Sequence, residues 1–303
     1  MATTVVAPTN NNIGLTSKYL PLLDQVYKRE SLTSMLDTAE ARVRWTGAKT
    51  VNIMNLNLVG MGNYDRDNGY VAGKTTATWE PYTIEIDRGR AYQFDEMDNE
   101  EALSMVVGNA LGVTERENLI PEMDAYRFAK WAGTTGVTSV GANIVPGTTN
   151  VADLIDTAEA QMDNDEVPYE GRILFINPQG YNVLKGNVER RIINSEDNVN
   201  TNIEFYDDMR IIRVPQSRFN TAVTLNAPTQ PTDVGGYTAT GDAINFMIVH
   251  PSAILQVVKH NTARLFTPSQ FFEMDGYRLN YRVYHDTFVL KNKVKGIYVH
   301  HAV

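Results

Sequence analysis

The sequence predicts an α+β protein in which a long two-stranded arm, a long helix and a compact α/β region follow one another. Alternating apolar residues on both sides of a glycine-rich tract predict the arm between residues 49 and 86. A helical repeat of apolar residues predicts the long helix between 98 and 131. Short apolar strands that alternate with helices after residue 150 predict the α/β region.

The composition is that of a folded chain without cysteine chemistry. The 303 residues are 43% hydrophobic and 21% charged, and none is cysteine. Disulfides, thiolate zinc sites, iron–sulfur clusters and thiol nucleophiles are therefore excluded. No run approaches the ~18 apolar residues of a membrane helix, and residues 1–6 lack the basic start of a secretion signal. We expect a soluble protein made inside the cell.

The charge is negative overall and unevenly spread. The formal net charge is −9, but residues 259–303 carry seven Lys or Arg against three acids, which leaves −13 on the first 258 residues. Tight duplex binding needs a field of phosphate-neutralising cations that the chain lacks overall, which argues against a sequence-reading nucleic-acid binder. The uneven charge is instead one way for a subunit to meet its neighbour.

The N-terminal part predicts a polar arm followed by short helices. Residues 1–14 are polar, Asn-rich and without periodicity, which predicts an extended or mobile arm. Pro21 suits a first helical turn, so a short helix is expected to begin there. A second short helix or turn is expected to carry Leu32, Met35 and Leu36.

Between Lys49 and Ile86 the apolar pattern has the period of a strand. Two such runs flank the tract from Gly60 to Gly69, which is rich in Gly, Asn and Asp. This arrangement predicts a long β-hairpin rather than a compact sheet. An isolated hairpin is marginal in water, and the chain offers no obvious support for it. Apolar loop residues such as Val59 are a liability in a monomer and useful at a contact between subunits.

The segment from Asp98 to Trp131 carries the strongest helical signal. Apolar residues recur at helical spacing from Ala102, and acidic residues crowd the start, where they favour the helix dipole. Gly112 and Pro121 are expected to kink or divide the helix. Uninterrupted, its 34 residues would span about 50 Å.

The α/β region follows a linker of small residues over 133–147. The expected elements are a helix from about Val151, a strand over 172–176, a helix from Pro178, strands over 210–214, 243–249 and 254–258, and closing strands over 277–290 and 296–300. The Pro- and Thr-rich tract 227–237 is expected to be a surface loop.

Several short patterns resemble chemical sites but are better explained as turns or solvated surface. The stretch 69–75 has three residues between its glycines where a phosphate loop has four, and 65–69 lacks the ligand set of a calcium loop. The five histidines have no metal-ligand spacing, and no Gly-x-Ser-x-Gly elbow is present. No spacing selects two carboxylates for a glycosidase pair. We expect no catalytic residue, no metal and no cofactor.

Taken in order, these elements resemble the major capsid protein of tailed bacteriophages, the Hong Kong 97-type capsid fold family. Residues 79–84 (WEPYTI) with 87–90 (DRGR) are similar to the exit from that family's extended loop into its peripheral domain. Residues 116–127 (RENLIPEMDAYR) resemble its spine helix. Residues 172–178 (RILFINP) and 211–219 (IIRVPQSRF) resemble strands of its axial domain. The resemblance covers nearly the whole chain.

The resemblance implies a division of the chain into four parts. These are an N-terminal arm and short helix at 1–35, an extended loop at 36–86, a peripheral domain with the spine helix at 87–135 and 259–303, and an axial domain at 136–258. The loop and the N-terminal arm would each reach across a subunit boundary. Because only a short arm precedes Pro21, either scaffolding comes from a separate protein or the chain is already processed.

The resemblance also implies a structural protein rather than an enzyme. Copies of the chain would form hexamers and pentamers of an icosahedral shell that encloses double-stranded DNA. The implied location is the virion capsid, after assembly in the host cytoplasm. The implied partners are further copies of the chain, a scaffolding protein, a portal and the packaged DNA, with a decoration protein as a further candidate and no membrane.

Six residues of the extended loop are the expected contacts with a neighbouring subunit. They are Met61, Tyr64, Arg66, Tyr70, Lys74 and Trp79. Some relatives join a loop lysine to an asparagine of another subunit, and Lys74 is a conceivable lysine of this kind. No partner motif can be assigned, so no crosslink is predicted.

Two other interpretations stay open at the level of sequence. A different phage structural protein, such as a tail-tube or decoration subunit, would have more strand and no helix of about 50 Å. A carboxylate-dependent hydrolase would have one concave pocket that holds acids with shifted pKa values.

Overall fold

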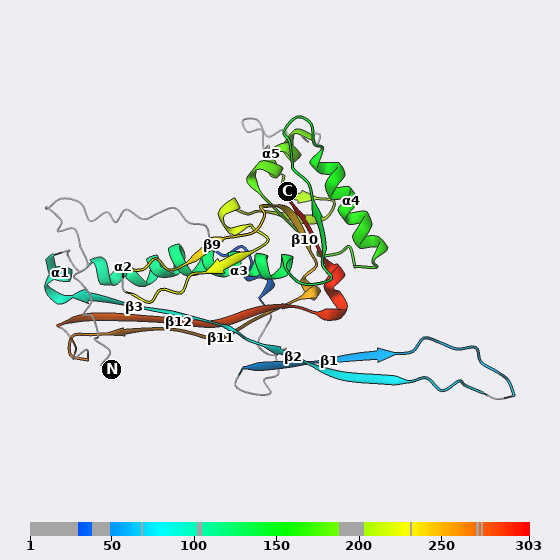
Figure 1. Cartoon of the computed structure of the whole chain (residues 1–303), viewed down its shortest axis with the longest axis horizontal. Coiled ribbons are helices and arrows are strands. Elements are labelled where there is room, and N and C mark those ends of the chain that lie inside the picture. Colours follow the sequence, from blue (N-terminus) through cyan, green and yellow to red (C-terminus); the bar gives the residue numbers. More distant parts are fainter. Residues whose placement is uncertain are drawn as a thin grey trace, which may run out of the picture.

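The computed structural model describes residues 30–37, 49–67, 69–101, 105–187, 203–230, 232–270, 273 and 275–303. The predicted arm over 1–14, the helix expected at Pro21 and residues 38–48 of the predicted extended loop lie outside this part. The described chain is elongated (Figure 1): a layer of long strands lies beneath a helix, an α/β body stands at one end, and a two-stranded ribbon projects beyond it. The short helix expected near Met35 is a 3₁₀ turn, Ser34–Leu36.

The long strands form a three-stranded antiparallel sheet with the order β11-β12-β3. The strands are β3 (Ile86–Asp95), β11 (Ile254–Phe266) and β12 (Gly276–Val289). Alternate residues of β12, among them Leu279, Tyr281 and Val283, are buried, as expected for a sheet covered on one face. The helices α1 (Glu96–Glu101), α2 (Met105–Val113) and α3 (Ile120–Ala132) run along this layer (Figure 1).

The predicted long helix is interrupted in a different place than expected. Gly112 lies inside α2 and Pro121 lies in the first turn of α3, with a π-helical segment, Thr114–Leu119, between them. Proline has no N–H to donate to the carbonyl four residues earlier, so the regular helical ladder breaks just before Pro121. The irregularity therefore falls between the two residues rather than at either one.

The α/β body is a six-stranded sheet with the order β4-β13-β10-β5-β7-β6. Its strands are β4 (Thr138–Gly141), β5 (Ile173–Ile176), β6 (Phe205–Tyr206), β7 (Met209–Arg213), β10 (Ile244–Val249) and β13 (Ile297–His301). Every residue of β5 and β10 is buried, which is typical of central strands covered on both faces.

Two apolar clusters cover the two faces of this sheet. On one face, α4 (Val151–Asn164) and α5 (Pro178–Asn187) pack against Leu174 and Phe246. On the other face, Phe128 and Trp131 of α3 pack against Phe175. Because α3 contacts both this sheet and β12, it helps to join the body to the long strands, and Ile254 of β11 and Val289 of β12 belong to the same apolar cluster.

One strand is longer than predicted, and another belongs to a different sheet than its predicted domain implies. β11 runs on to Phe266, so residue 258, the expected end of the axial domain, lies inside a continuous strand. The closing strand β13 was grouped with the preceding strands in 259–303, but it pairs with β10 and β4 instead. Val299 and Tyr298 contribute to the clusters on opposite faces of the sheet. An apolar strand with two buried faces belongs in the interior of a sheet.

The Pro- and Thr-rich tract forms the tip of a second, smaller hairpin. Its strands are β8 (Val223–Leu225) and β9 (Tyr237–Ala239), which pair antiparallel. The hairpin lies beside α3 (Figure 1). None of the helices in the described ranges is long and apolar enough to cross a membrane.

Candidate intersubunit contact surface

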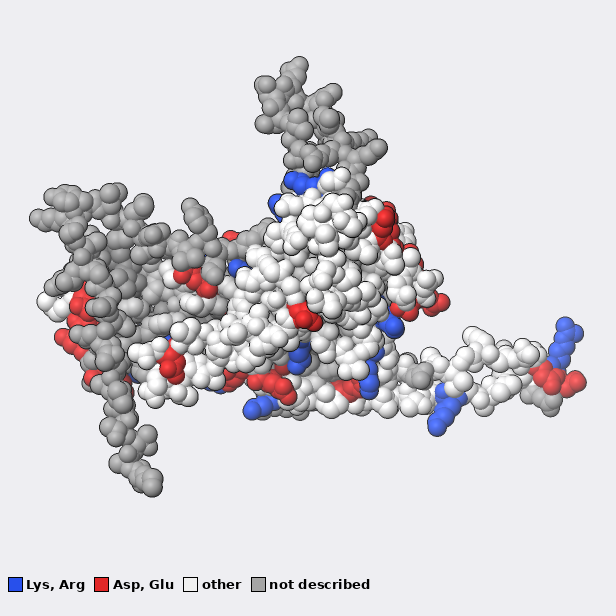
Figure 2. Space-filling view, turned by 45° about the horizontal axis from the view of Figure 1, so that its top comes forward, with Lys and Arg blue, Asp and Glu red and all other residues white. Residues whose placement is uncertain are grey.

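The ribbon consists of two paired strands and a long loop. β1 (Thr50–Leu58) and β2 (Thr75–Thr83) pair antiparallel in continuous register from Thr50 with Thr83 to Leu58 with Thr75. The loop 59–74 continues beyond them, and the whole limb extends away from the body (Figures 1 and 2). The hairpin predicted from the glycine-rich tract is therefore present, and its outer half projects away from the body of its own subunit.

The root of the ribbon is packed on the long strands. Val51 and Ile84 are 2% and 1% exposed and form an apolar cluster with Leu255, Val257 and Phe288. This cluster supplies the support that the sequence did not reveal, because its members come from positions about two hundred residues apart.

Polar contacts extend this support a short way along the ribbon. The amides of Asn55 and Asn292 donate to each other's carbonyl oxygens, at 2.6 and 3.3 Å. Lys291 forms an ion pair with Glu80 at 3.1 Å. Both contacts lie on the face of the ribbon that is turned toward the body.

The opposite face of the ribbon carries an exposed apolar stripe, consisting of Met54, Leu56, Leu58 and Trp79. Met54 lies opposite Trp79 in the strand register, and successive side chains of a strand point to opposite faces, so these residues share one face. Their exposed fractions are 53%, 51%, 63% and 62%. A one-sided apolar surface on a projecting ribbon is typical of an interaction site.

All six predicted contact residues are exposed in the structure. Met61, Tyr64, Arg66, Tyr70 and Lys74 lie on the loop 59–74, and Trp79 lies on β2 within the apolar stripe. The rings of Tyr64 and Tyr70 pack edge to face with centroids 4.9 Å apart. The structure thus places the six residues on one limb, and their contact with a second subunit stays a prediction.

Three stripe residues, Met54, Leu56 and Leu58, were missed by sequence reasoning. Their i, i+2, i+4 spacing was visible as strand alternation. The spacing alone does not tell which of the two faces is covered by the body. That choice depends on the root cluster, whose partners on β11 and β12 are distant in sequence.

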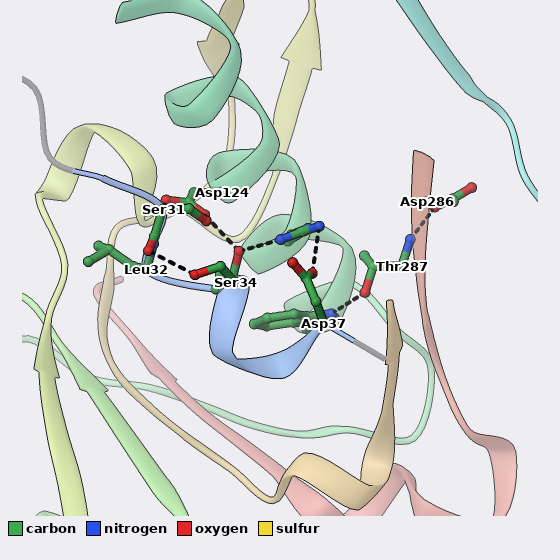
Figure 3. Close-up of polar contacts among 10 residues, drawn as sticks. Ser31, Leu32, Ser34, Asp37, Asp124, Asp286 and Thr287 are labelled. Carbon is green, nitrogen blue, oxygen red and sulfur yellow. Dashed lines mark hydrogen bonds and ion pairs between the residues drawn. The ribbon is translucent and has the colours of Figure 1, made fainter. Parts of the chain in front are cut away.

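The segment 30–37 is tied to α3 through a buried polar network (Figure 3). The carboxylate of Asp124 is fully buried and accepts hydrogen bonds from the Ser31 hydroxyl, the Leu32 N–H, the Thr33 hydroxyl and the Arg218 guanidinium. Such a set of donors compensates the cost of burying the charge. The segment therefore has a fixed position on its own chain.

Arg127 of α3 completes this network. It donates to the Thr33 hydroxyl at 2.8 Å and forms an ion pair with Asp37 at 3.0 Å. Burial raises the pKa of Asp37, and the charge of Arg127 acts in the opposite direction. The predicted crossing of the N-terminal arm to another subunit concerns residues outside the described part.

A hydrolase site would need a pocket and carboxylates with raised pKa values in the same place, but among the described residues the pocket and the carboxylates with raised pKa values lie in different places. A cavity of about 400 Å³ lies between β3, the π-helical segment and the loop of the β8–β9 hairpin. Glu122, which lines it, forms a bidentate ion pair with Arg88. Burial and the nearby Asp207 charge raise the pKa of Glu159 to about 7, but this residue lies on α4 and does not line the cavity. Asp233 is the other carboxylate that lines the cavity, and hydrogen bonds from backbone N–H groups in its own loop lower its pKa.

The positive charge of residues 259–303 is partly matched within the chain. Arg282 pairs with Asp87, Lys291 with Glu80, and Lys295 with Asp165. The uneven distribution along the sequence is therefore reduced in the folded molecule. Within the described ranges, no group of three or more His, Asp or Glu side chains is arranged to hold a metal ion.

Comparison with known proteins identifies the fold. No family model and no curated protein matches the sequence. Among solved structures, the capsid structure of the cyanophage P-SCSP1u matches with a TM-score of 0.66 and 15% identity, over 98% of this chain and 95% of that one. A structure from Gordonia phage Cozz matches with a TM-score of 0.62 and 13% identity, over 100% and 98%. The mature capsid of bacteriophage PhiM1 matches with a TM-score of 0.59 and 12% identity, over 95% and 92%. The chain therefore has a mixed α+β fold that is shared, over nearly its full length, with phage capsid structures.

Proposed function

We propose that this chain is the major capsid protein of a tailed bacteriophage. Copies of it form hexamers and pentamers that close into an icosahedral shell around double-stranded DNA. The observation that carries the proposal is the projecting ribbon, whose apolar stripe is turned away from its own body, in a chain with the fold of phage capsid structures.

The energetics of the stripe suit reversible assembly. A fully buried large apolar side chain contributes about 1.5–3 kcal/mol. Each stripe residue is still roughly half exposed, so covering it on a neighbour adds about 1 kcal/mol per side chain. A contact of this size is weak alone and strong when symmetry repeats it around a closed shell.

The remaining parts of the proposal follow from the resemblance. The extended loop at 36–86 lies over a neighbouring subunit, the peripheral domain and the axial domain, whose sheet includes β13, form the shell wall, and the virion capsid is the final location. Assembly in the host cytoplasm involves a scaffolding protein and a portal, with a decoration protein as a further candidate. The net charge of −9 fits a wall that does not hold packaged DNA tightly.

The other interpretations have less support. Helical structure continues from Met105 through the π-helical segment to Ala132. This run of roughly 40 Å is shorter than the helix of about 50 Å named as the criterion, but it is a long helical element of the kind not expected in a tail-tube or decoration subunit. The hydrolase interpretation needs two carboxylates with shifted pKa values in one pocket. Glu159 lies apart from the cavity of about 400 Å³, and of the two carboxylates that line the cavity, Glu122 is paired with Arg88 and Asp233 has a lowered pKa.

The test is the assembly state of the purified chain, alone and with its scaffolding protein. We expect hexamers or larger species by size-exclusion chromatography and shells by negative-stain electron microscopy. A strictly monomeric protein at high concentration would contradict the proposal.

Two matched variants test the ribbon itself. Leu56→Asp places a charge in the apolar stripe, and Thr76→Asp places the same charge on the opposite face of the same ribbon. We expect both variants to fold with the wild-type circular dichroism spectrum, and only Leu56→Asp to abolish shells. Equal assembly of the two variants would remove the stripe from the proposal. Deletion of 60–69 is likewise expected to leave a folded chain that forms no shells.

A further inference from the structure

A buried carboxylate, that of Asp286 on β12, lies at the junction between the ribbon and the body. Figure 3 shows it with its contact to Thr287. Asp286 is 0% exposed. The pairing of β3 with β12 ends where Ile86 lies opposite His285, so the chain leaves the strand ladder at Glu85. Oδ2 of Asp286 accepts the Glu85 N–H at 3.1 Å. The Asp286 side chain therefore binds the backbone of the ribbon end at the point where the backbone pairing between β3 and β12 stops.

The second oxygen of Asp286 is bound to α3. Oδ1 accepts the Tyr126 hydroxyl at 2.9 Å and the Thr287 N–H at 2.8 Å, and the Lys130 ammonium lies 4.0 Å away. Next to it, the Trp131 indole N–H donates to the Thr287 hydroxyl at 2.8 Å. Hydrogen bonds to a charged acceptor are about twice as strong as those between neutral groups.

The hydroxyl of Tyr126 is held in its donating form. Burial and the negative charge of Asp286 both raise the Tyr126 pKa above its ordinary value. The phenol therefore stays protonated at physiological pH and keeps its hydrogen bond to the carboxylate.

We propose that Asp286 is a positioning residue that fixes the direction in which the ribbon leaves the body relative to α3. One carboxylate oxygen holds the ribbon end at Glu85 and the other holds α3 at Tyr126. A rotation of the ribbon end relative to β12 stretches the Glu85 bond, and a shift of α3 relative to β12 stretches the Tyr126 bond. The inference rests on the proposed function for its consequence: in a shell, the direction of the ribbon sets the angle between neighbouring subunits.

A pair of tyrosines provides a matched test. Tyr126→Phe removes the hydrogen bond between α3 and Asp286, whereas Tyr284→Phe removes a bond of equal length, 2.9 Å, from the Tyr284 hydroxyl to the Ile84 carbonyl. The second bond also lies at the ribbon root but does not involve α3. Asp286→Asn is the third variant, because it keeps only one acceptor oxygen and cannot accept both the Glu85 N–H and the Tyr126 hydroxyl.

The first measurement is a distance distribution in the unassembled protein. The chain has no cysteine, so spin labels can be placed at Ala77→Cys on the ribbon and at Glu115→Cys on the π-helical segment that leads into α3. We expect one narrow distribution for the unmodified background and for Tyr284→Phe. We expect Tyr126→Phe and Asp286→Asn to give a broad distance distribution instead of the narrow one. A narrow distribution for Tyr126→Phe would overturn the proposal.

The second measurement is the shape of the particles. Tyr126→Phe is expected to lower the urea midpoint more than Tyr284→Phe, because its lost bond is to a charged acceptor, so both variants are assembled under conditions in which each is fully folded. Tyr284→Phe is expected to give shells of uniform diameter, and Tyr126→Phe to give mixed diameters or open sheets. Uniform shells from Tyr126→Phe would contradict the positioning role. If the wild-type chain forms no shells at all, the proposed function fails, while the distance measurement still decides the role of Asp286.

Discussion

The ribbon β1–β2 and the hairpin β8–β9 are both antiparallel hairpins, but the first projects away from the body and the second lies against it. Both are two antiparallel strands joined by a loop rich in turn-forming residues. The small hairpin is held on its own chain by β3, because the guanidinium of Arg88 donates to the carbonyls of Asn226 and Gly236, at 2.7 and 3.2 Å. Arg90 adds two hydrogen bonds to the Asp233 carbonyl at 3.1 Å.

The ribbon loop is stabilised by local contacts instead. Asp65 and Gly69 exchange backbone hydrogen bonds, and Tyr64 packs on Tyr70. Two-stranded elements are marginal by themselves, so the difference lies in what each hairpin finds to contact. The β8–β9 hairpin is held against its own chain by hydrogen bonds from Arg88 and Arg90. The outer part of the ribbon projects away from the body and carries an exposed apolar stripe that a neighbouring subunit can cover.

The largest expected effect separates the root of the ribbon from its outer part. Ile84→Ala removes a buried side chain from the root cluster and is expected to lower the free energy of unfolding by about 3 kcal/mol. Leu56→Ala removes a half-exposed side chain of the stripe and is expected to change it by less than about 0.5 kcal/mol. Urea unfolding of the unassembled protein measures both. Equal losses would mean that the stripe is covered by its own chain.

A second test compares Arg88 on β3, which holds the β8–β9 hairpin, with Arg66 on the ribbon loop. Arg88→Ala removes the partner of Glu122 and two bonds to the β8–β9 loop, so we expect a loss of about 2 kcal/mol in the free energy of unfolding, moderated by the partial exposure of the pair. Arg66→Ala on the exposed ribbon loop is expected to cost less than about 0.5 kcal/mol. A comparable loss at Arg66 would show that the ribbon loop is also anchored.

A third test uses pH to loosen one hairpin. Hydrogen bonds from the backbone N–H groups of Gln230 and Thr229 lower the pKa of Asp233 below its ordinary value of 3.8. A lowered pKa in the folded state gives stability that is present above pH ~4 and is lost as the pH falls through the folded value. We expect hydrogen exchange at these two amides, corrected for its intrinsic pH dependence, to accelerate at low pH.

Asp233→Asn is the control for that experiment. Its side chain accepts hydrogen bonds but does not titrate in this range. The variant is therefore expected to lose the acid-dependent acceleration. If the acceleration persists in Asp233→Asn, another group controls the loop.

The smallest expected effect concerns an exposed apolar residue on the small hairpin. Val234 is 85% exposed at its tip, but it is a single side chain and not part of a stripe. Val234→Ser is expected to leave assembly unchanged and the free energy of unfolding within about 0.5 kcal/mol. If Val234→Ser formed no shells, the β8–β9 hairpin would also be a contact surface between subunits, and the two hairpins would not differ in this respect.

Elements with a strong local signal were predictable. The period-two runs around 60–69 gave the ribbon, the helical repeat around Ala110 gave the long helix, and the apolar run 173–176 gave a buried strand. The place of β13 was not predictable, because an apolar strand of five residues fits either sheet. Its pairing with β10 and β4 depends on contacts between segments far apart in the chain.

The candidate surface was predictable only in part. The six predicted contact residues were taken from the extended loop that the family resemblance implies, and all six are exposed. The stripe formed by Met54, Leu56 and Leu58 escaped because strand alternation defines two faces without saying which is covered. The roles of the buried carboxylates Asp124 and Asp286 were not predicted either, because a single buried Asp has no repeat or spacing that distinguishes it from a surface Asp in the sequence.

The sequence by itself determined that this chain contains a long β-ribbon, a long helix and an α/β region, because strand and helix periodicities are local properties of neighbouring residues. The tertiary structure alone decided which face of the ribbon is free, which hairpin is clamped, and that Asp286 links Glu85 to Tyr126. These outcomes depend on residues up to two hundred positions apart, and only folding brings such residues within contact distance.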